Sequence, residues 1–482
     1  MASKPALAFP SPISLSKVKS TSPWLTSASL LTGDAIALSV VYWLAVFSCY
    51  LITHGYTLKF YLSAFWGLSL YLLAFLICGL YPGVLLHPAE ELKRVALGVT
   101  AAFLASVSLL FIARSATSYS RSVLLATWAV GAPAVVLGRY LVRRLCLGQS
   151  WWGQSAVVLG SGEPALRLIR CLTRNPAGIR VVGVIADEYS AMWPGDLPPI
   201  LSYGGHASDS ALGRVAKYII VPASNRSPMQ LRQTIQRFCR GFRHILLVPE
   251  LTGMCSLGIA ACDIGGEVGF EVPQRLFHPV ARYVKRLMDI ALSALILLIL
   301  LPVFLVTSLL VRIGSRGPVL FGHLRHGKDG QLFRAWKFRT MVMNADQVLN
   351  DHLRAHPEDA IAWEYDRKLR RDPRITTAGK WLRRYSLDEL PQLWNVLTGD
   401  MSLVGPRPIV KAEISKYGEG YDLYTRVSPG ITGLWQVSGR NNTTYHERVA
   451  FDEYYVRNWS IWLDAYILAR TVKVVVTAEG AY

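Results

Sequence analysis

The sequence is poor in charged residues for a chain of its size. Only 17% of its 482 residues are Asp, Glu, Lys or Arg, whereas 52% are hydrophobic. Soluble proteins average about 25% charged residues. The shortage argues against an ordinary cytosolic enzyme and predicts a membrane protein, and the length predicts two or three domains.

Acidic residues are the scarcer of the two charged kinds. The chain has 51 Lys and Arg residues against 32 Asp and Glu residues, a formal net charge of +19. Such an excess favours phosphates or anionic lipid headgroups as partners. Because the excess occurs on both sides of residue 284, it is not a basic tail for nucleic acid, and we expect no nucleic-acid partner.

Two kinds of motif are missing. The seven cysteines include no C-x-x-C pair, and no His-x-x-x-His motif lies near them, so neither a zinc site nor a disulfide framework is predicted. The first 23 residues contain no apolar run, so no cleavable signal is predicted. We expect this end of the chain to stay in the cytoplasm.

Four apolar stretches follow, each about long enough to cross a hydrocarbon core about 30 Å thick. They lie at about Ala35–Ile52, Phe60–Leu80, Val95–Ala113 and Ser122–Gly138. We interpret them as a four-helix transmembrane bundle within residues 1–148. The alternative, buried helices of a soluble protein, is weaker because four long runs in so short a segment are hard to bury.

Basic residues set the expected orientation of these helices. They occur in the N-terminal tail, at Lys93 and Arg94 beside the loop before the third stretch, and at Arg139, Arg143 and Arg144 after the fourth. By the positive-inside rule these segments face the cytoplasm. We therefore expect both ends of the bundle on the cytoplasmic side.

An α/β pattern begins after residue 148. The buried-strand pattern Ala156–Leu159 leads into a turn with Gly160 and Gly162, and a second strand, Val181–Ile185, ends at Asp187. This arrangement is typical of a Rossmann-type βαβ unit, in which an acid holds a ribose hydroxyl. We predict a Rossmann-like soluble domain over residues 149–275; the same glycines also occur in domains that only regulate or oligomerise, so nucleotide binding stays open. Further strands are expected at Tyr218–Val221 and Ile245–Val248, with a helix at Met229–Phe238.

A fifth apolar run, Ile290–Val311, carries no charge and is long enough to span a membrane. Basic residues lie on both sides of it, from Lys285 and from Arg312, so both flanks look cytoplasmic. Pro302 in its middle removes a backbone donor and collides with the preceding turn. A re-entrant helix at about residues 286–311 satisfies both observations, and a kinked spanning helix is the alternative.

Past this run the chain is rich in arginine. Six basic residues are accompanied by one acid, Asp372. The six are Arg370, Arg371, Arg374, Lys380, Arg383 and Arg384. Mutual repulsion makes such a cluster costly unless anions or an anionic membrane face it. A solvated basic surface is the alternative.

Two adjacent acids follow the basic cluster. Ser386 and Glu389 have the spacing of a capping box, which places Asp388 in the first turn of a helix. The acids then either only cap the helix, or the helix dipole keeps Asp388 ionised as a nucleophile while Glu389 binds Mg²⁺. The spacing alone leaves both interpretations open.

Five segments beyond Lys285 carry a family pattern. They are FRAWKFRTM at Phe333–Met341, DPRIT at Asp372–Thr376, SLDELPQ at Ser386–Gln392, GDMSLVGPRP at Gly399–Pro408 and GLWQVSGRN at Gly433–Asn441. Together they resemble the bacterial sugar transferases that start polysaccharide assembly, the monotopic polyprenyl-phosphate hexose-1-phosphate transferases. The whole layout resembles the large subfamily of undecaprenyl-phosphate galactose phosphotransferases.

The resemblance implies a mainly helical catalytic domain over residues 283–482. It would transfer hexose-1-phosphate from UDP-hexose to undecaprenyl phosphate and release UMP. Asp388 would be the nucleophile, and Glu389 would bind Mg²⁺. Arginine forks match phosphate oxygens, and we assign six basic residues to substrate binding: Lys337, Arg339, Arg383, Arg407, Arg440 and Arg325.

The resemblance also implies a place and partners. The protein would be a multi-pass protein of the bacterial inner membrane with its catalytic domain on the cytoplasmic face, in contact with membrane lipids, and a homo-oligomer stays open. Galactose is the favoured sugar and glucose the alternative. Exopolysaccharide, capsule and O-antigen are equally open as products. The family often has Ser before the proline of the membrane helix; here it is Leu301, which leaves the helix angle open.

Other classes of protein fit parts of the sequence. A membrane-anchored Rossmann enzyme that modifies nucleotide sugars would need a Tyr-x-x-x-Lys pair, and the chain has none. A transporter or a non-catalytic assembly scaffold would use the first four helices, which offer Asp34 near a membrane face and no intramembrane ionic path. Aromatic residues near the end predict either a helix at headgroup level or a packed core helix. They are Tyr454, Tyr455, Trp459, Trp462 and Tyr466.

Overall fold

The structure is a computed structural model, in which the chain forms two compact units, Met1–Leu251 and Thr252–Tyr482. It describes residues 21–53, 65, 67–83, 86–112, 120–174, 178–186, 197–203, 212, 216–223, 227–239, 242–249, 260–264, 267–271, 276, 278–366, 369, 372–438 and 443–477.

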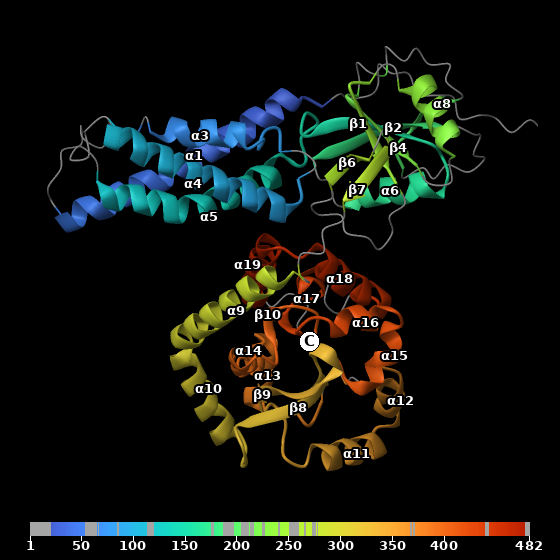
Figure 1. Cartoon of the computed structure of the whole chain (residues 1–482). Helices are drawn as coiled ribbons and strands as arrows, with labels where there is room; N and C mark the ends of the chain where they lie inside the picture. Colours follow the sequence, from blue (N-terminus) through green and yellow to red (C-terminus); the bar gives the residue numbers. More distant parts are fainter. Residues whose placement is uncertain are drawn as a thin grey trace, which may run out of the picture. The chain divides into compact units, whose positions relative to one another are not determined.

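The first unit begins with apolar helices that lie side by side in Figure 1. They are α1 (Pro23–Thr53), α3 (Leu68–Ile77), α4 (Pro88–Ile112) and α5 (Arg121–Cys146). Among the described residues, α1, α4 and α5 are long and apolar enough to cross a membrane, and α3 is a shorter apolar helix. The chain is therefore a membrane protein. The start of the predicted stretch Phe60–Leu80 lies outside the described residues, so the four-helix bundle stays a prediction.

A buried ionic cluster joins three of these helices. Arg139 of α5 is 1% exposed, and its guanidinium lies 2.6 Å from the Asp34 carboxylate of α1 and 3.0 Å from the Glu91 carboxylate of α4. Arg143 reaches the same Glu91 at 2.6 Å. Buried charges are tolerated only when they are paired and hydrogen-bonded. The fourth stretch thus continues past its predicted end at Gly138, and Arg139, expected as a flanking charge, lies inside the cluster.

The rest of the first unit contains a five-stranded parallel sheet in the order β3-β2-β1-β4-β5. Its elements are β1 (Gln154–Leu159), α6 (Glu163–Arg174), β2 (Ile179–Ala186), β3 (Ile200–Tyr203), β4 (Tyr218–Pro222), α8 (Pro228–Phe238) and β5 (His244–Val248). The four predicted strands and the helix before β5 are confirmed. β1, β2 and β4 are largely buried, and buried parallel strands read as continuous apolar runs. Gly160 after β1 has φ 103°, which favours glycine. Asp187 lies outside the described residues.

The second unit is mainly helical and contains two antiparallel hairpins. Its elements begin with β6 (Ala260–Ile264), β7 (Glu267–Glu271), α9 (Pro279–Ile299), α10 (Leu301–Gly314), β8 (Leu320–His326), η4 (Lys328–Gly330) and β9 (Leu332–Phe338). They continue with α11 (Ala345–Ala355), α12 (Pro357–Asp366), α13 (Thr377–Arg384), η5 (Leu387–Glu389), α14 (Gln392–Thr398), β10 (Ser402–Val404), η6 (Lys411–Glu413), α15 (Ile414–Tyr417), α16 (Gly420–Thr425), β11 (Gly430–Thr432), α17 (Leu434–Ser438), α18 (Tyr445–Asn458) and α19 (Ile461–Thr477).

The fifth apolar run is bent. Helices α9 and α10 meet at 64°, with the break at Leu300 (Figure 1). Pro302 follows the break directly, and a proline cannot donate the hydrogen bond that would continue α9. The bend therefore forms although Leu301 replaces the serine that is common in the family.

Both outer ends of the bent pair attach to the same body of the second unit. Arg286 near the start of α9 donates to the carbonyl of Leu397 at 2.9 Å. Val311 near the end of α10 packs in a buried cluster with Phe338 and Leu382. Many apolar side chains between these two attachments stay exposed, among them Leu298, Ile299 and Leu305.

Two of the late aromatic residues are buried. Tyr455 is 1% exposed and Trp459 is 4% exposed. The Tyr455 hydroxyl and the Trp459 indole both donate to the Asp464 carboxylate, at 2.8 and 3.1 Å. These two residues belong to a packed core, which was one of the two predicted alternatives.

Candidate active site

The hairpin β8–β9 forms one wall of a cavity of about 760 Å³ in the second unit. Alternate residues of a strand face the same side, so Phe321, His323 and Arg325 of β8 face the cavity together. Antiparallel pairing sets Lys337 of β9 opposite Phe321. Further wall residues are Thr340–Met343, Arg374, Arg383, Ser386, Asp388, Glu389, Arg407 and Trp435.

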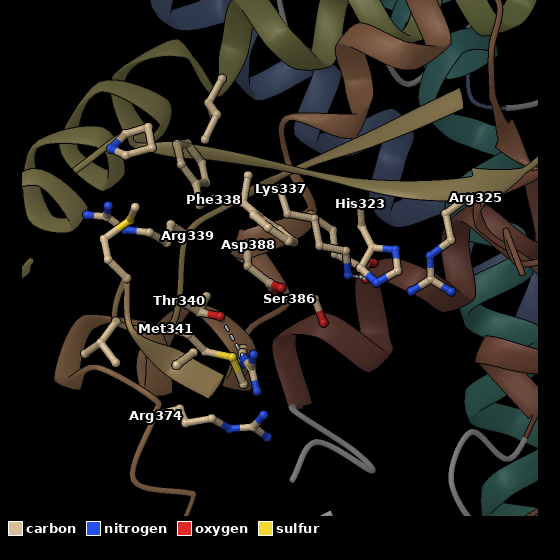
Figure 2. Close-up of a pocket in the computed structure, with 18 of the residues that line it drawn as sticks. His323, Arg325, Lys337, Phe338, Arg339, Thr340, Met341, Arg374, Ser386 and Asp388 are labelled. Carbon is tan, nitrogen blue, oxygen red and sulfur yellow. Dashed lines mark hydrogen bonds and ion pairs between the residues drawn. The ribbon is translucent and has the colours of Figure 1, made fainter. Parts of the chain in front are cut away.

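Asp388 lies near the middle of this cavity. In Figure 2, Thr340, Met341 and Arg374 lie on one side of it and His323 and Arg325 on the other. The residue belongs to the single 3₁₀ turn η5, because α14 begins only at Gln392.

The predicted capping box is wrong. Ser386 has φ 55° and ψ 23°, a left-handed conformation, and its side chain makes no capping hydrogen bond. An N-cap residue instead has an extended backbone and accepts from the turn that follows. The charge state of Asp388 is therefore set by its neighbours, without a capped α-helix behind it.

The Asp388 carboxyl is held in a poorly solvated place. It is 9% exposed, and burial raises its pKa from 3.8 to about 6. Lys337 and Arg383 lower this pKa, and Glu389 raises it. A carboxylate with few water contacts that is still ionised at neutral pH is suited to nucleophilic work.

Glu389 forms an ion pair with Lys337 in the wall of the cavity. Its Oε1 lies 2.6 Å from Nζ of Lys337, and neither side chain is more than 23% exposed. The pair connects η5 to β9. Lys337 therefore fixes the Glu389 side chain and stabilises the ionised form of Asp388 beside it.

Arg383 is the second cation near Asp388. Its Nε donates to Oγ1 of Thr340 at 2.9 Å, which orients the guanidinium. Burial lowers the pKa of Arg383, while Asp388 raises it. Arg374 lies in the same wall and forms a two-pronged pair with Asp372, at 2.8 and 2.7 Å. This side of the cavity thus presents ordered guanidinium groups.

The opposite side presents Arg325 and Arg407. Burial lowers the pKa of Arg325, and repulsion from Arg407 lowers it further. The Arg407 guanidinium lies 5.8 Å from the ring centre of Trp435, and Arg325 is 3.8 Å from Glu413. Two guanidinium groups that repel one another at a cavity wall are stabilised by a bound anion such as a phosphate.

Arg339 lines the cavity but uses its guanidinium elsewhere. Its two terminal nitrogens donate to the carbonyls of Ser315 at 2.6 Å and Arg316 at 3.1 Å. These bonds tie the end of β9 to the turn after α10. Arg339 therefore holds the wall in place, and its donors are less available to a substrate than those of Arg383.

Two family models match the chain. Bacterial sugar transferase matches residues 280–478, and CoA-binding domain matches residues 77–249. The chain is 37% identical to undecaprenyl-phosphate galactose phosphotransferase of Salmonella typhimurium, over 80% of this chain and 81% of the relative. It is 35% identical to UDP-galactose-lipid carrier transferase of Erwinia amylovora, over 75% and 76%. The chain belongs to the bacterial sugar transferase family.

One relative is much shorter than this sugar transferase. ExoY of Sinorhizobium fredii, an exopolysaccharide production protein, is 44% identical over 215 residues. The match covers 44% of this chain but 95% of the relative. Almost the whole of that relative therefore matches less than half of this chain.

The predicted site residues of the sugar transferase lie together where the structure describes them. Asp388, Glu389, Lys337, Arg339, Arg383, Arg407 and Arg325 all line the one cavity. Arg440 lies outside the described residues. Sequence reasoning did not assign His323, Arg374 or Trp435 to the site. The alternation of β8 around Arg325 could have found His323, whereas Arg374 and Trp435 come from distant segments.

The adjacent acids of the sugar transferase offer limited metal ligation. Among residues covered by the structure, no group of three or more His, Cys, Asp or Glu could hold a metal ion. Mg²⁺ commonly takes one or two carboxylates and completes its shell with water and substrate phosphates. Asp388 and Glu389 fit that pattern, in which a bound phosphate would supply the missing oxygens.

Proposed function

We propose that the protein transfers hexose-1-phosphate from UDP-hexose to undecaprenyl phosphate, giving undecaprenyl-diphospho-hexose and UMP. This would be the first membrane step of exopolysaccharide, capsule or O-antigen synthesis. The names of the relatives support this reaction. The observation that carries it is the buried Asp388 carboxylate inside a cavity lined with cations.

The reaction proceeds in two displacements on phosphorus. An oxygen of Asp388 attacks the β-phosphorus of UDP-hexose, the bond to the α-phosphate oxygen breaks, and UMP leaves with that electron pair. A phosphate oxygen of the lipid then attacks the same phosphorus. The Asp388–phosphorus bond breaks, and the carboxylate is regenerated without a net proton change on the residue.

The cations supply charge neutralisation and positioning, which are the chief needs of phosphoryl transfer. We assign Lys337, Arg325 and Arg407 to the diphosphate of the nucleotide sugar, because all three line the cavity. Arg407 and Glu389 both shift the pKa of Arg325, and Lys337 pairs with Glu389. Arg383 stabilises the ionised nucleophile. Arg440 joins this group from the family resemblance alone.

We propose Mg²⁺ as the cofactor, held by Glu389 with help from Asp388. A bound Mg²⁺ would neutralise part of the diphosphate charge. Lys337 keeps Glu389 in place through the 2.6 Å ion pair until the substrate arrives.

We propose galactose as the sugar. Relatives named for galactose are 35% and 37% identical to this chain. UDP-glucose:undecaprenyl-phosphate glucose-1-phosphate transferase of Escherichia coli is 32% identical over 72% of this chain. The alternative substrate is therefore UDP-glucose.

We propose that α9 and α10 form a re-entrant helix pair. The attachments of Arg286 and Val311 to one body would be broken if the pair spanned the bilayer and left its ends on opposite sides. Both ends then face the cytoplasm of a bacterium with the active site at the inner-membrane surface, where a lipid phosphate meets a soluble nucleotide sugar.

We propose three domains: a four-helix transmembrane domain over residues 1–148, a Rossmann-like domain over 149–275 and the catalytic domain over 283–482. The strand order β3-β2-β1-β4-β5 supports the second, since it is the order of a doubly wound sheet. The matched region 280–478 supports the third. The first two domains would serve self-association, stability or control of chain length.

The deciding experiment is mass spectrometry of the full-length protein after incubation with UDP-galactose and Mg²⁺, without lipid. A hexose-phosphate adduct should map to the peptide that carries Asp388, with UMP released in equal amount. UMP release that strictly requires lipid, without any adduct, would contradict the covalent route. No UMP from any UDP-hexose, with lipid present, would contradict the function itself.

A further inference from the structure

The active-site cavity has two chemically different ends. Part of its lining is apolar and is formed by Pro318, Leu320, Phe321, Met341, Val342 and Met343, and Met341 lies beside the polar Thr340 and Arg374 (Figure 2). Phe321 is 54% exposed and Met343 is 63% exposed. Large apolar side chains that remain exposed at the mouth of a polar site mark a surface for an apolar ligand.

This apolar wall adjoins α10. The Phe338 ring, which lines the cavity, lies 4.8 Å from the Phe304 ring of α10. Met343 lies against Gly317 in the turn after α10, where an added Cβ would come within 2.9 Å of the methionine sulfur. The wall therefore begins where the proposed membrane helix ends.

The outer face of α10 is apolar as well. Its exposed side chains include Leu305, Val306, Leu309, Leu310 and Ile313, each at least 51% exposed, and the charged Arg312 is exposed in its last turn. Such a face is stable in lipid and costly in water. A lipid lying beside α10 would therefore meet the wall of Phe321 and Met343 just beyond the exposed Arg312 and Arg316 at the end of the helix.

A cation, the Arg383 guanidinium, lies at the inner edge of this wall. Arg383 is oriented by its 2.9 Å bond to Thr340, and it is close enough to Asp388 to lower the pKa of that carboxyl. A guanidinium next to the nucleophile can receive the phosphate of an incoming lipid.

The other end of the cavity has a different character. Arg407 lies over the Trp435 ring, whose indole nitrogen is fixed by a 2.7 Å bond to Thr443. Arg448 lies 4.8 Å from the same ring centre and is 3.1 Å from Glu413. A fixed aromatic face beside guanidinium groups suits a base and its diphosphate.

We propose that the cavity receives its two substrates from opposite ends. Undecaprenyl phosphate enters along α10 over Phe321 and Met343, with its phosphate at Arg383. The nucleotide sugar occupies the end with Arg325, Arg407 and Trp435. The inference rests on the proposed function and assigns the acceptor-binding wall and the donor-binding end separately.

The consequence is that the two half-reactions respond to different residues. UMP formation from UDP-hexose uses only the donor end and Asp388. Transfer of hexose phosphate from Asp388 to the lipid uses the apolar wall. In that second step the lipid phosphate oxygen forms the new bond to phosphorus as the bond to Asp388 breaks.

The test uses the full-length protein in nanodiscs with UDP-galactose and undecaprenyl phosphate. Phe321→Gln and Met343→Gln each remove one apolar contact at an exposed position, so folding should be retained. We expect a roughly tenfold rise in KM for undecaprenyl phosphate, the effect of losing one buried apolar side chain. The UMP burst without lipid should stay within about twofold of the wild type.

Matched controls lie on the same hairpin. Leu324 and Leu332 are 56% and 60% exposed, and neither is among the residues that line the cavity. Leu324→Gln and Leu332→Gln should leave the KM for the lipid unchanged. Trp435→Leu should do the reverse of the wall variants, with a weaker UMP burst and a normal transfer of preloaded hexose phosphate.

Two results would overturn the assignment. One is an unchanged KM for the lipid in both wall variants. The other is a slowed UMP burst in Met343→Gln with normal transfer from preloaded enzyme. Either result leaves the wild-type adduct on Asp388 in place, so it counts against the two-ended cavity alone. A wild-type protein without any UMP release contradicts the proposed function instead.

Discussion

Replacing Asp388 by Asn should abolish the reaction and at the same time stabilise the fold. The carboxyl is 9% exposed, and burial raises its pKa to about 6 from an ordinary 3.8. Folding therefore shifts the carboxyl toward its protonated form, although it stays ionised above about pH 6. At 1.36 kcal/mol for each pKa unit, ionised Asp388 costs the fold about 3 kcal/mol.

The direction of the pKa shift determines how this free-energy cost depends on pH. Because the folded pKa is the higher one, the cost is fully present above about pH 6 and disappears as the pH falls toward 3.8. The amide of Asn has no charge to desolvate at any pH. Asp388→Asn should therefore gain about 3 kcal/mol at pH 7.5 and about half of that at pH 5.

The assay is thermal unfolding of detergent-solubilised full-length protein, followed by tryptophan fluorescence at both pH values. A gain of about 3 kcal/mol corresponds to about 6 to 12 °C for a unit of this size. Asp351 is exposed on α11, so Asp351→Asn is the matched control and should change little. A lower midpoint for Asp388→Asn at pH 7.5, or an equal gain at both pH values, would refute the reasoning.

Three further predictions follow from the same geometry. UMP release should be half-maximal near pH 6 and fall about tenfold for each further pH unit below it, as the buried Asp388 becomes protonated; a flat pH profile down to 4.5 would contradict this. Lys337→Met removes a cation that lowers the pKa of Asp388, so the half-maximal pH should move upward, and Lys337→Arg should move it less. Cysteines at Arg282 and Arg316, on the two flanks of the bent helix pair, should both be labelled only from the cytoplasmic side in intact cells and inverted vesicles. Periplasmic labelling at residue 316 would mean that the pair spans the membrane.

The sheet was predictable from the sequence where its strands are long. β1 is buried along its whole length, and β4 at four of its five positions, so both appear as unbroken apolar runs. β3 (Ile200–Tyr203) has four residues, one of them Ser202. A strand that short shows too little hydrophobic periodicity to be distinguished from a loop in the sequence. It forms because β2 supplies a partner edge, which is a tertiary cause.

The failed capping box shows how a neighbouring element can override a local motif. Helix α13 ends at Arg384 with Tyr385 as its C-cap, so Ser386 stands directly after that cap. Helices very commonly end with a left-handed residue at this position, and Ser386 adopts that conformation. A residue that completes the end of one helix cannot have the extended backbone needed to begin the next. Ser386 and Glu389 do have the spacing of a capping box, but the end of α13 determines the backbone conformation of Ser386.

Arg339 and Arg383 show why charge and sequence motif could not distinguish an arginine that holds the cavity wall from one that binds the substrate. Both arginines were assigned to substrate binding from the sequence, and both line the cavity. The difference comes from the turn after α10, whose carbonyls at Ser315 and Arg316 lie within reach of Arg339. Carbonyls in so tight a turn lack strand partners and take the guanidinium donors instead. That turn is placed by the bent helix pair α9–α10, which lies outside the segments that carry both arginines, so a separate element determines which arginine is left to meet a phosphate.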